Sequence, residues 1–470
     1  MRIALPKGRL LGEISELLRR AGWGLSGYTA TERLYHLKSR KFPQLMAKVF
    51  HEKDIPVQVA VGNYDLGICG LDWVEELQAK YPSSALVKVS NLGCGVGQLY
   101  MAASQAQGVT TAEELRSQSG VVRIASEYPN LAESFALDLR LRRFSVVPLW
   151  GAAEVYPPES ADMVLIAGRN EEELDSLGLV PVSGILGFSA YLIANKMSWE
   201  TKDMSDVLDS IQREAAGSQA LYSPVDMTPR IAGNSSAIEV KEDTIRLALP
   251  DGHQQEPTVA LLNRADIQVE DYPSETGNRR PTTNIAGMTV KVIRPQDMPL
   301  QVANGNFDLA ITGRDWLLEH LYQFPSSPVT ELLALNFGWV RIVAVVSKEL
   351  TVDGVDSLRR YSAEGSSSLR VASEYVNIAD KYARDNHLGM YRVIPTWGAT
   401  EAFLPEDADL LIENTETGRT LARHGLKIVD TLFESTACLI GQAGGRYSPA
   451  KRERIHSIIE ALRRAVEEEN

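Results

Sequence analysis

Short apolar segments alternate with amphipathic ones along the whole chain. In the first half, the apolar pattern of buried strands occurs at Ile3–Leu5, Leu66–Ile68, Gln98–Ala102, Val122–Ala125 and Met163–Ile166. Segments with the apolar spacing of helices lie between them, for example Leu10–Arg20 and Asn130–Leu139. Strands that alternate with helices predict an α/β fold with parallel sheets covered by helices. Ligands of such folds bind where strand C-termini meet helix N-termini.

The same order of segments occurs twice. Asp54–Val74 matches Asp297–Leu317 at 13 of 21 aligned positions, and Arg123–Ala132 resembles Arg370–Ala379. Two repeats of this length are two whole domains rather than turns of a solenoid. We therefore expect a first unit at 1–216, a linker rich in Ser, Pro and Gly at 217–243, and a second unit at 244–470.

Composition and charge narrow the class of protein. The 470 residues are 44% hydrophobic and 23% charged, which is ordinary for globular domains. The net charge of −13 argues against general nucleic-acid binding. No apolar run reaches the roughly 20 residues of a membrane-spanning helix, and the N-terminus lacks the apolar core of a signal peptide. With only three cysteines, these features predict a cytoplasmic protein without a membrane or nucleic-acid partner.

One segment of the second half carries a specific chemical pattern. A buried strand ends at Glu413, and a loop of hydroxyls and glycine leads into a helix start. Free N–H groups at a helix start bind phosphate, and Thr417 and Thr420 add hydroxyl donors around Gly418. Glu413 and Glu416 can accept hydrogen bonds from two vicinal hydroxyls. The pattern predicts a ribose 5-phosphate site, with an ordinary capped helix start as the alternative.

The two halves differ at their charged motifs in opposite directions. At the position of Thr417–Thr420, the first half has Asn170-Glu171-Glu172-Glu173, whose carboxylates would repel a phosphate. After the first strand, the first half instead has Lys7-Gly8-Arg9 where the second half has Asp251-Gly252-His253. Lys7 and Arg9 are suited to a polyphosphate, although two solvated cations would look the same.

Together, these motifs resemble the ATP phosphoribosyltransferase family. The family's Lys-Gly-Arg corresponds to Lys7–Arg9, and its Asp-(Ile/Val)-Pro segment resembles both Asp54–Asp72 and Asp297–Asp315. Its Ala-Thr-x-Tyr-x-Asn-x-Ala segment resembles Ala125–Ala132 and Ala372–Ala379. Its Asp-x-x-x-Thr-Gly-x-Thr-Leu loop corresponds to Glu413–Leu421, with Glu in place of Asp. The resemblance covers nearly the whole chain as two tandem short-form catalytic units.

The resemblance implies a fold and a reaction. Each unit is expected to have two α/β lobes around a cleft, similar to type II periplasmic binding proteins. The adenine N1 of ATP attacks C1 of phosphoribosyl pyrophosphate, giving phosphoribosyl-ATP and pyrophosphate in the first step of histidine biosynthesis. Mg²⁺ is expected with the substrate phosphates.

Carried onto this sequence, the resemblance assigns three groups of residues. The site for phosphoribosyl pyrophosphate comprises Glu413, Thr415, Glu416, Thr417, Gly418, Arg419 and Thr420. The site for ATP comprises Arg294, Gly313, Asp315 and Glu401. The catalytic cations are Arg9, Lys7, Arg279 and Arg280.

The complementary losses suggest one composite active site per chain. The second unit would supply the sugar-phosphate loop and Arg279 or Arg280, and the first would supply Arg9 and Lys7. The first unit's own cleft, with Trp150, Gly151 and Glu154, is expected to be a scaffold, with an effector site for ATP, AMP or histidine as the alternative.

Two other functions fit the sequence less well. One is a non-catalytic regulatory paralogue that binds nucleotide or histidine, and the other is a small-molecule binding protein of the periplasmic type. The resemblance also implies a higher oligomer and a histidyl-tRNA-synthetase-like regulatory partner. Residues 446–470 read as one charged helix, so the family's ferredoxin-like regulatory domain is expected to be absent.

Overall fold

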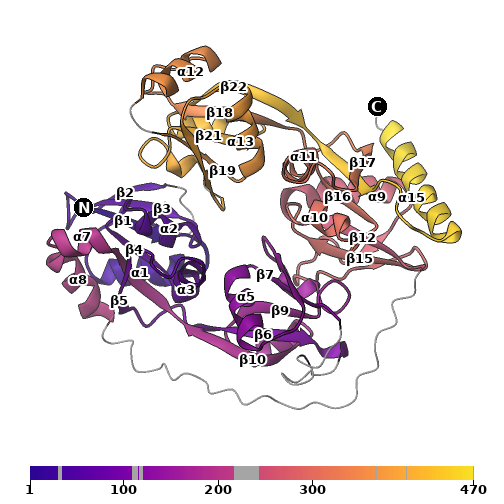
Figure 1. The fold of residues 1–470 in the computed structure, drawn as a ribbon, viewed down its shortest axis with the longest axis horizontal. Helices are drawn as coiled ribbons and strands as arrows, with labels where there is room; N and C mark the ends of the chain where they lie inside the picture. Colours follow the sequence, from indigo (N-terminus) through magenta and orange to yellow (C-terminus); the bar gives the residue numbers. More distant parts are fainter. Residues whose placement is uncertain are drawn as a thin grey trace. The chain divides into compact units, whose positions relative to one another are not determined.

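The computed structural model describes residues 1–29, 34–107, 115, 120–215, 243–365, 368–398 and 400–468. The chain forms two compact units (Figure 1). Unit 1 contains the described residues of Met1–Leu149 and Tyr156–Ile238 together with Trp397–Ala402. Unit 2 contains Trp150–Val155 together with the described residues of Glu239–Thr396 and Phe403–Asn470. Apart from Asp243, the predicted linker lies outside the described residues.

The division into units does not follow the sequence repeats throughout. Trp150–Val155 comes from the first repeat and belongs to unit 2, while the equivalent Trp397–Ala402 comes from the second repeat and belongs to unit 1. The repeats have therefore exchanged one short segment.

The first lobe of unit 1 is built on a six-stranded sheet in the order β2-β3-β1-β4-β11-β5. Its strands are β1 (Arg2–Pro6), β2 (His36–Lys38), β3 (Met46–Phe50), β4 (Leu66–Gly70), β5 (Leu86–Asn91) and β11 (Ala190–Asn195). Its helices are α1 (Leu11–Arg20), α2 (Asp54–Ala60), α3 (Leu71–Lys80), α7 (Lys196–Thr201) and α8 (Ser205–Ala215), with the 3₁₀ turn η1 (Gly8–Leu10) after β1.

The second lobe of unit 1 has a five-stranded sheet in the order β10-β6-β9-β7-β8. Its strands are β6 (Gly97–Ser104), β7 (Val122–Ser126), β8 (Phe144–Pro148), β9 (Met163–Gly168) and β10 (Leu179–Phe188). The helices α5 (Pro129–Asp138) and α6 (Glu171–Ser176) follow β7 and β9, and the 3₁₀ turn η2 (Gln105–Gln107) follows β6.

Unit 2 repeats this plan. The first lobe has strands β12 (Ile245–Pro250), β15 (Met288–Ile293), β16 (Leu309–Gly313), β17 (Val329–Ala334) and β23 (Ala437–Gln442) in the order β15-β12-β16-β23-β17. It is accompanied by η5 (Gly252–Gln254), α9 (Gln255–Arg264), α10 (Met298–Ala303), α11 (Arg314–Gln323), α15 (Pro449–Glu467) and the separate strand pair β13 (Val269–Glu270) and β14 (Thr282–Thr283).

The second lobe of unit 2 follows the order β20-β19-β21-β18-β22. Its strands are β18 (Val340–Ser347), β19 (Leu369–Ser373), β20 (Tyr391–Pro395), β21 (Leu410–Thr415) and β22 (Leu426–Ser435). Its helices are α12 (Val355–Glu364), α13 (Val376–Asp385) and α14 (Arg419–Arg423). The 3₁₀ turns η3 (Ala153–Val155) and η6 (Thr400–Phe403) occupy the exchanged segments, η6 extending one residue beyond its segment.

The predicted α/β class, with two units of two lobes, is confirmed. The expectation of parallel sheets is correct only in part, because each of the four main sheets also contains antiparallel pairs. β1 pairs in parallel with β3 and β4, but β11 runs antiparallel between β4 and β5, and β23 does the same in unit 2. The chain leaves the first lobe after β5, builds the second lobe, and returns through β10 and β11. The returning strand runs antiparallel to both of its neighbours, and in unit 1 the edge strand β2 is also antiparallel to β3.

Burial explains why the central strands read as continuous apolar runs. Every residue of β4 and of β16 is buried, because helices or loops cover both faces of these sheets. Ile455, Ile458 and Leu462 of α15 close the core of the first lobe in unit 2, so the predicted C-terminal helix is confirmed. Within the ranges given above, no helix combines the length and the apolar character needed to cross a bilayer.

Candidate active site

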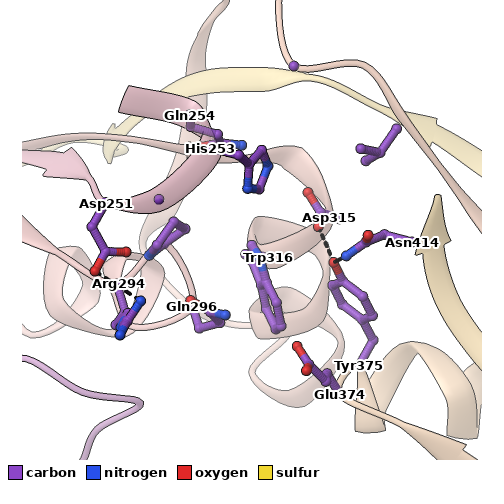
Figure 2. A pocket seen from close by; sticks show the side chains of 14 residues that line it. Asp251, His253, Gln254, Arg294, Gln296, Asp315, Trp316, Glu374, Tyr375 and Asn414 are labelled. Atoms are coloured by element: carbon purple, nitrogen blue, oxygen red, sulfur yellow. Dashed lines mark hydrogen bonds and ion pairs between the residues drawn. The ribbon is translucent and has the colours of Figure 1, made fainter. Parts of the chain in front are cut away.

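A cavity of about 240 Å³ lies between the two lobes of unit 2 (Figure 2). It is lined at the C-terminal ends of the strands, where parallel α/β sheets bind ligands. The lining residues are Asp251, Gly252, His253, Gln254, Arg294, Pro295, Gln296, Asp315, Trp316, Gly338, Val340, Glu374, Tyr375 and Asn414.

Asp315 and Tyr375 connect the two lobes at this cavity. The Tyr375 hydroxyl donates to Asp315 at 2.6 Å and accepts from the Asn414 amide at 2.8 Å (Figure 2). The Ser435 hydroxyl donates to the other Asp315 oxygen at 2.8 Å. Gly313 is required directly before α11, because a Cβ there would collide with the Asp315 carboxylate. Burial, with the negative charge of Asp315, raises the pKa of Tyr375 well above its ordinary value, so Tyr375 stays a hydroxyl donor.

An aromatic wall stands beside this network. The rings of Trp316 and Tyr375 are stacked with centroids 4.3 Å apart. Trp316 follows Asp315 on the first turn of α11, while Tyr375 precedes α13, so each lobe contributes one ring. A planar base could extend such a stack.

Arginines surround Asp251 on the side of the first lobe. Arg294 Nη1 lies 3.0 Å and Arg279 Nη1 3.2 Å from the Asp251 carboxylate. Arg279 Nε also lies 3.0 Å from Glu154 of the exchanged segment. Arg294 Nε is buried and has no hydrogen-bond partner within the described part of the chain. One carboxylate thus orients two guanidinium groups, one of which lines the cavity.

The predicted sugar-phosphate loop forms a compact turn between β21 and α14. The Gly418 N–H donates to Thr415 Oγ1 at 2.9 Å, and Gly418 has φ +72°, which explains the glycine. The side chains of Glu416, Thr417 and Thr420 are exposed on this turn. In the first repeat, Asn170 instead caps α6 by accepting from the Glu173 N–H at 3.0 Å. The Thr415–Thr420 turn follows directly on Asn414, which lines the cavity.

In unit 1, the equivalent strand ends carry a cluster of ion-paired side chains around Arg9. Arg9 Nη2 donates to both oxygens of Asp72 at 2.8 and 2.6 Å, and Arg9 Nε donates to Glu52 at 3.0 Å. The guanidinium lies over the Phe188 ring at 4.8 Å, and the Tyr128 hydroxyl donates to Asp72 at 2.7 Å. Burial opposes the charged form, but attraction by Asp72 and Glu52 raises the pKa of Arg9 above its ordinary value.

A second ion pair closes unit 1 between its lobes. Lys53 of the first lobe lies 2.7 Å from Glu127 of the second, and its ammonium group lies over the Trp73 ring. At these positions unit 2 has Gln296, Glu374 and Trp316, which line its cavity. The two units therefore differ at these positions: a lysine–glutamate ion pair joins the lobes of unit 1, and the equivalent residues of unit 2 line its cavity.

The structure brings together some of the predicted residues. Arg294 and Asp315 line the cavity of unit 2, and Arg279 lies beside Arg294 on the same carboxylate. Gly313 is not a lining residue and ends β16 directly before α11. Arg280 donates to the backbone of Val155 at 2.9 Å. Glu413, Thr415, Glu416, Thr417, Gly418, Arg419 and Thr420 lie on the end of β21, the turn and the start of α14.

Other predicted residues lie elsewhere. Glu401 belongs to unit 1, where it accepts a hydrogen bond from the Tyr35 hydroxyl at 3.0 Å. Lys7 and Arg9 also belong to unit 1, and their predicted catalytic role stays a prediction. Trp150, Gly151 and Glu154 were expected in the first unit's cleft, and this placement is wrong because their segment belongs to unit 2.

Sequence reasoning missed the residues that shape the cavity wall. Tyr375 was seen only as part of a repeated motif, while Trp316, Asn414 and Ser435 were not singled out. The available signal was a difference between repeats: Ser435 stands where the first repeat has Phe188, and Asn414 where it has Ala167. Both substitutions replace an apolar residue by a polar one beside the cavity.

His51 gives unit 1 a titration that unit 2 lacks, since Arg294 stands at the same position. Burial and the positive charges of Lys53, Lys7 and Arg9 lower the pKa of His51 to about 3. The unfolded chain therefore binds this proton first as the pH falls below its ordinary value of 6.5. Unit 1 should lose stability from about pH 6.5 downward, by at most ~1.4 kcal/mol per pH unit from this group.

Hydrogen exchange of the β4 amides against pH measures this effect. The His51→Asn variant should lose that part of the slope, and exchange of the β16 amides in unit 2 serves as the internal reference. An identical pH slope in wild type and variant would contradict the assignment.

Unit 2 thus combines two α/β lobes with a hydroxyl-rich turn, paired arginines and an aromatic wall. The family model described as ATP phosphoribosyltransferase matches residues 51–214 and 294–464. The chain belongs to the ATP phosphoribosyltransferase family, and it carries the family's sequence twice. It is accordingly a glycosyltransferase-type enzyme of histidine biosynthesis.

Individual relatives each match about half of the chain. The ATP phosphoribosyltransferase of Prosthecochloris aestuarii is 31% identical over 234 residues, covering 49% of this chain and 74% of the relative. That of Saccharolobus solfataricus is 32% identical over 206 residues, covering 42% and 64%. This pattern is consistent with a tandem duplication.

Solved structures match in the same way. An ATP phosphoribosyl transferase (HisG:HisZ) complex from Thermotoga maritima aligns over 46% of this chain and 99% of that chain, with 20% identity and a TM-score of 0.39. The arginine-bound form of a truncated arginine-binding protein from Thermotoga maritima aligns over 49% and 98%, with 12% identity and a TM-score of 0.30.

Proposed function

We propose that unit 2 transfers the phosphoribosyl group of phosphoribosyl pyrophosphate to N1 of ATP, giving phosphoribosyl-ATP and pyrophosphate. The observation that carries this proposal is the presence in one unit of the hydroxyl-rich turn after β21 and of the cavity with its paired arginines. The first repeat has three carboxylates at the same turn. Those carboxylates would repel the sugar phosphate.

The reaction needs positioning and charge stabilisation rather than a strong base. The C1–oxygen bond breaks as pyrophosphate leaves with the bonding electrons, and the lone pair of adenine N1 forms the new bond to C1. Arg279 and Arg294, oriented by Asp251, would stabilise the charge that develops on pyrophosphate. The turn at Thr415–Thr420 would hold the 5-phosphate, and the Trp316 ring offers a stacking surface for adenine.

Mg²⁺ is proposed to enter with the substrate phosphates. In the part of the chain that the structure describes, no three His, Cys, Asp or Glu side chains are grouped so as to hold a metal ion. Mg²⁺ commonly keeps several waters and binds through phosphates with one or two carboxylates, and Asp251 could supply one. The ion would neutralise part of the pyrophosphate charge.

The proposal includes one active site per chain. Unit 1 lacks the hydroxyl-rich turn, and Arg9 and Lys53 pair with carboxylates of the equivalent cleft. A scaffold role for unit 1 is favoured over an effector site. Arg9 and Lys7 stay candidates for a contribution to the reaction, and Arg9→Ala tests it.

A direct assay tests both the reaction and the number of sites. Protein, ATP, Mg²⁺, phosphoribosyl pyrophosphate and pyrophosphatase are mixed, and absorbance near 290 nm should rise as adenine is alkylated. Calorimetric titration of the full chain with phosphoribosyl pyrophosphate and Mg²⁺ should give one molecule per chain. Absence of turnover would sink the transferase proposal and leave the regulatory paralogue, while a stoichiometry of two would sink only the single site.

The assay should be repeated with a histidyl-tRNA-synthetase-like regulatory subunit. Such a partner, a higher oligomer and a cytoplasmic setting accompany this proposal, and stimulation of turnover by the added subunit would support the partner.

A further inference from the structure

The exchanged segment Trp150–Val155 is attached to unit 2 at several points. The Trp150 N–H donates to both oxygens of Asp297 at 3.1 and 3.2 Å. The Val155 carbonyl accepts from Lys291 Nζ at 2.8 Å and from Arg280 Nη2 at 2.9 Å. The segment is therefore hydrogen-bonded to unit 2 at both of its ends.

Between these ends, the segment reaches the arginines of the candidate site. The Glu154 carboxylate lies 3.0 Å from Arg279 Nε, while Asp251 lies 3.2 Å from Arg279 Nη1. A Cβ at Gly151 would approach Arg294 Nε to 3.0 Å, so the glycine lets the backbone pass close to this second arginine. The Trp150 ring lies with its centroid 5.7 Å from that of Trp316.

The ion pairs around Arg279 indicate the role of Glu154. Arg279 is held from two sides by carboxylates on different segments, and its side chain is 25% exposed. Asp251 is shared with Arg294 at 3.0 Å. A guanidinium held at Nε by one carboxylate and at Nη1 by another has a fixed plane, which is the property needed to present its remaining N–H groups to an anion.

We propose that Glu154 of the first repeat is a positioning residue for Arg279 of the second, so that unit 2 receives part of its site from the degenerate repeat. This inference rests on the proposed function for its kinetic test and goes beyond it in assigning the residue. It gives the first repeat a role that requires neither its own sugar-phosphate turn nor a ligand in its own cleft.

The equivalent segment of the second repeat offers a natural comparison. Glu401 of Trp397–Ala402 accepts a hydrogen bond from the neutral Tyr35 hydroxyl in unit 1. The same motif, Trp-Gly-x-x-Glu, therefore carries an ion pair with an arginine in unit 2 and a hydrogen bond with a tyrosine in unit 1.

A double-mutant cycle tests the proposal in the full chain. Glu154→Gln should lower kcat on the order of tenfold, because it removes the charge of the carboxylate paired with Arg279 Nε, while the KM for ATP stays within twofold. Arg279→Gln should lower kcat further. In the Arg279→Gln background, Glu154→Gln should change kcat less than twofold, since Glu154 acts through Arg279. Additive effects of the two substitutions would overturn the proposal.

Two further variants separate positioning from folding. Glu154→Asp keeps the charge and should recover part of kcat, and it replaces Glu154→Gln in the cycle if that variant does not fold. Tyr35→Phe removes the equivalent contact in unit 1 and should leave kcat within twofold of wild type. An equal loss in Tyr35→Phe would mean that exchange of the segments, rather than Glu154, is what matters.

Binding measurements separate this proposal from the proposed reaction. Wild type, Glu154→Gln and Glu154→Asp are titrated with phosphoribosyl pyrophosphate and with inorganic pyrophosphate, each with Mg²⁺. If wild type binds but shows no turnover, the transferase proposal fails, and a loss of affinity in Glu154→Gln restored in Glu154→Asp still supports positioning. If the three proteins bind equally, the positioning proposal fails whether or not turnover occurs. If wild type binds neither ligand, both fail.

Discussion

Replacing Thr417-Gly418-Arg419-Thr420 with Asn-Glu-Glu-Glu, the tetrapeptide of the first repeat, should lower kcat/KM for phosphoribosyl pyrophosphate on the order of 10³-fold. The replacement removes two hydroxyls and a glycine turn and places three carboxylates where the phosphate would bind. Two lost hydrogen bonds to a charged group already account for roughly this factor. Carboxylates at a helix start also stabilise the helix dipole, so the graft should not unfold unit 2.

The first repeat already contains the grafted tetrapeptide at the start of a helix. Asn170 caps α6 and three glutamates occupy its first turn, so the graft should form a capped helix in place of α14. Circular dichroism and hydrogen exchange of the β21 amides would establish this, alongside steady-state kinetics. Activity within tenfold of wild type in a folded graft would exclude the turn as the phosphate site.

The reverse graft is the matched control. Introducing Thr-Gly-Arg-Thr at 170–173 restores the turn in the first repeat but leaves Arg9 paired with Asp72 and Lys53 paired with Glu127 in unit 1. The stoichiometry of phosphoribosyl pyrophosphate binding should stay at one per chain. A rise to two would show that the turn alone makes a site and that the internal ion pairs are not what closes unit 1.

The sequence carried enough information to predict most of the fold. The expected strands overlap β1, β4, β6, β7 and β9, and the expected helices overlap α1 and α5, because these elements have strong apolar periodicity. The apolar pattern of a strand does not indicate whether it runs parallel or antiparallel to its neighbours. β11 and β4 are both fully or largely buried apolar runs, and only the path of the chain through the second lobe makes one antiparallel to the other.

Local sequence could not predict on which unit each exchanged segment packs. Trp150, Gly151 and Glu154 match Trp397, Gly398 and Glu401 residue for residue. Nothing in the motif says on which unit it packs, since that depends on partners distant in sequence, Asp297 and Arg279 for one copy and Tyr35 for the other.

Candidate cations were visible in the sequence, but their partners were not. Lys7-Gly8-Arg9 could be recognised as basic, whereas the pairing of Arg9 with Asp72 depends on three-dimensional packing at the end of β4. The turn after β21 was easier to predict as a turn, because its hydroxyls, glycine and flanking carboxylates are consecutive, and its phosphate-binding role stays a prediction. A motif of consecutive residues in one loop can be recognised in the sequence, whereas a site assembled from the ends of several strands cannot.

The two units share one arrangement of an aspartate and a tyrosine, but the residues around this arrangement differ. Asp72 and Asp315 both follow a glycine at the end of a buried strand, and each accepts a tyrosine hydroxyl from the other lobe. Arg9 completes the arrangement in unit 1. In unit 2, Ser435 takes the second oxygen, and His253 stands where the arginine would be. The arginine of unit 1 is thus replaced by a histidine that lines the cavity of unit 2.

Asp72→Ala should therefore destabilise unit 1 far more than a surface substitution, by about 3 kcal/mol. Asp72 is fully buried and accepts three hydrogen bonds, from Arg9 twice and from Tyr128 once. Its removal leaves the buried Tyr128 hydroxyl without this acceptor and leaves Arg9 with Glu52 alone. Because Glu52 and solvent screen part of the Arg9 charge, the expected effect lies at the lower end of values for broken buried pairs.

Hydrogen exchange can assign this loss to one unit. Amides of β1 and β4 should lose protection in Asp72→Ala, while those of β12 and β16 keep it. In the double variant Arg9→Met and Asp72→Ala, the destabilisation should be smaller than the sum of the two single effects, because the unpaired cation has been removed with its partner. Strictly additive effects, or equal loss of protection in both units, would mean that the Arg9–Asp72 pair does not specifically stabilise the first lobe of unit 1.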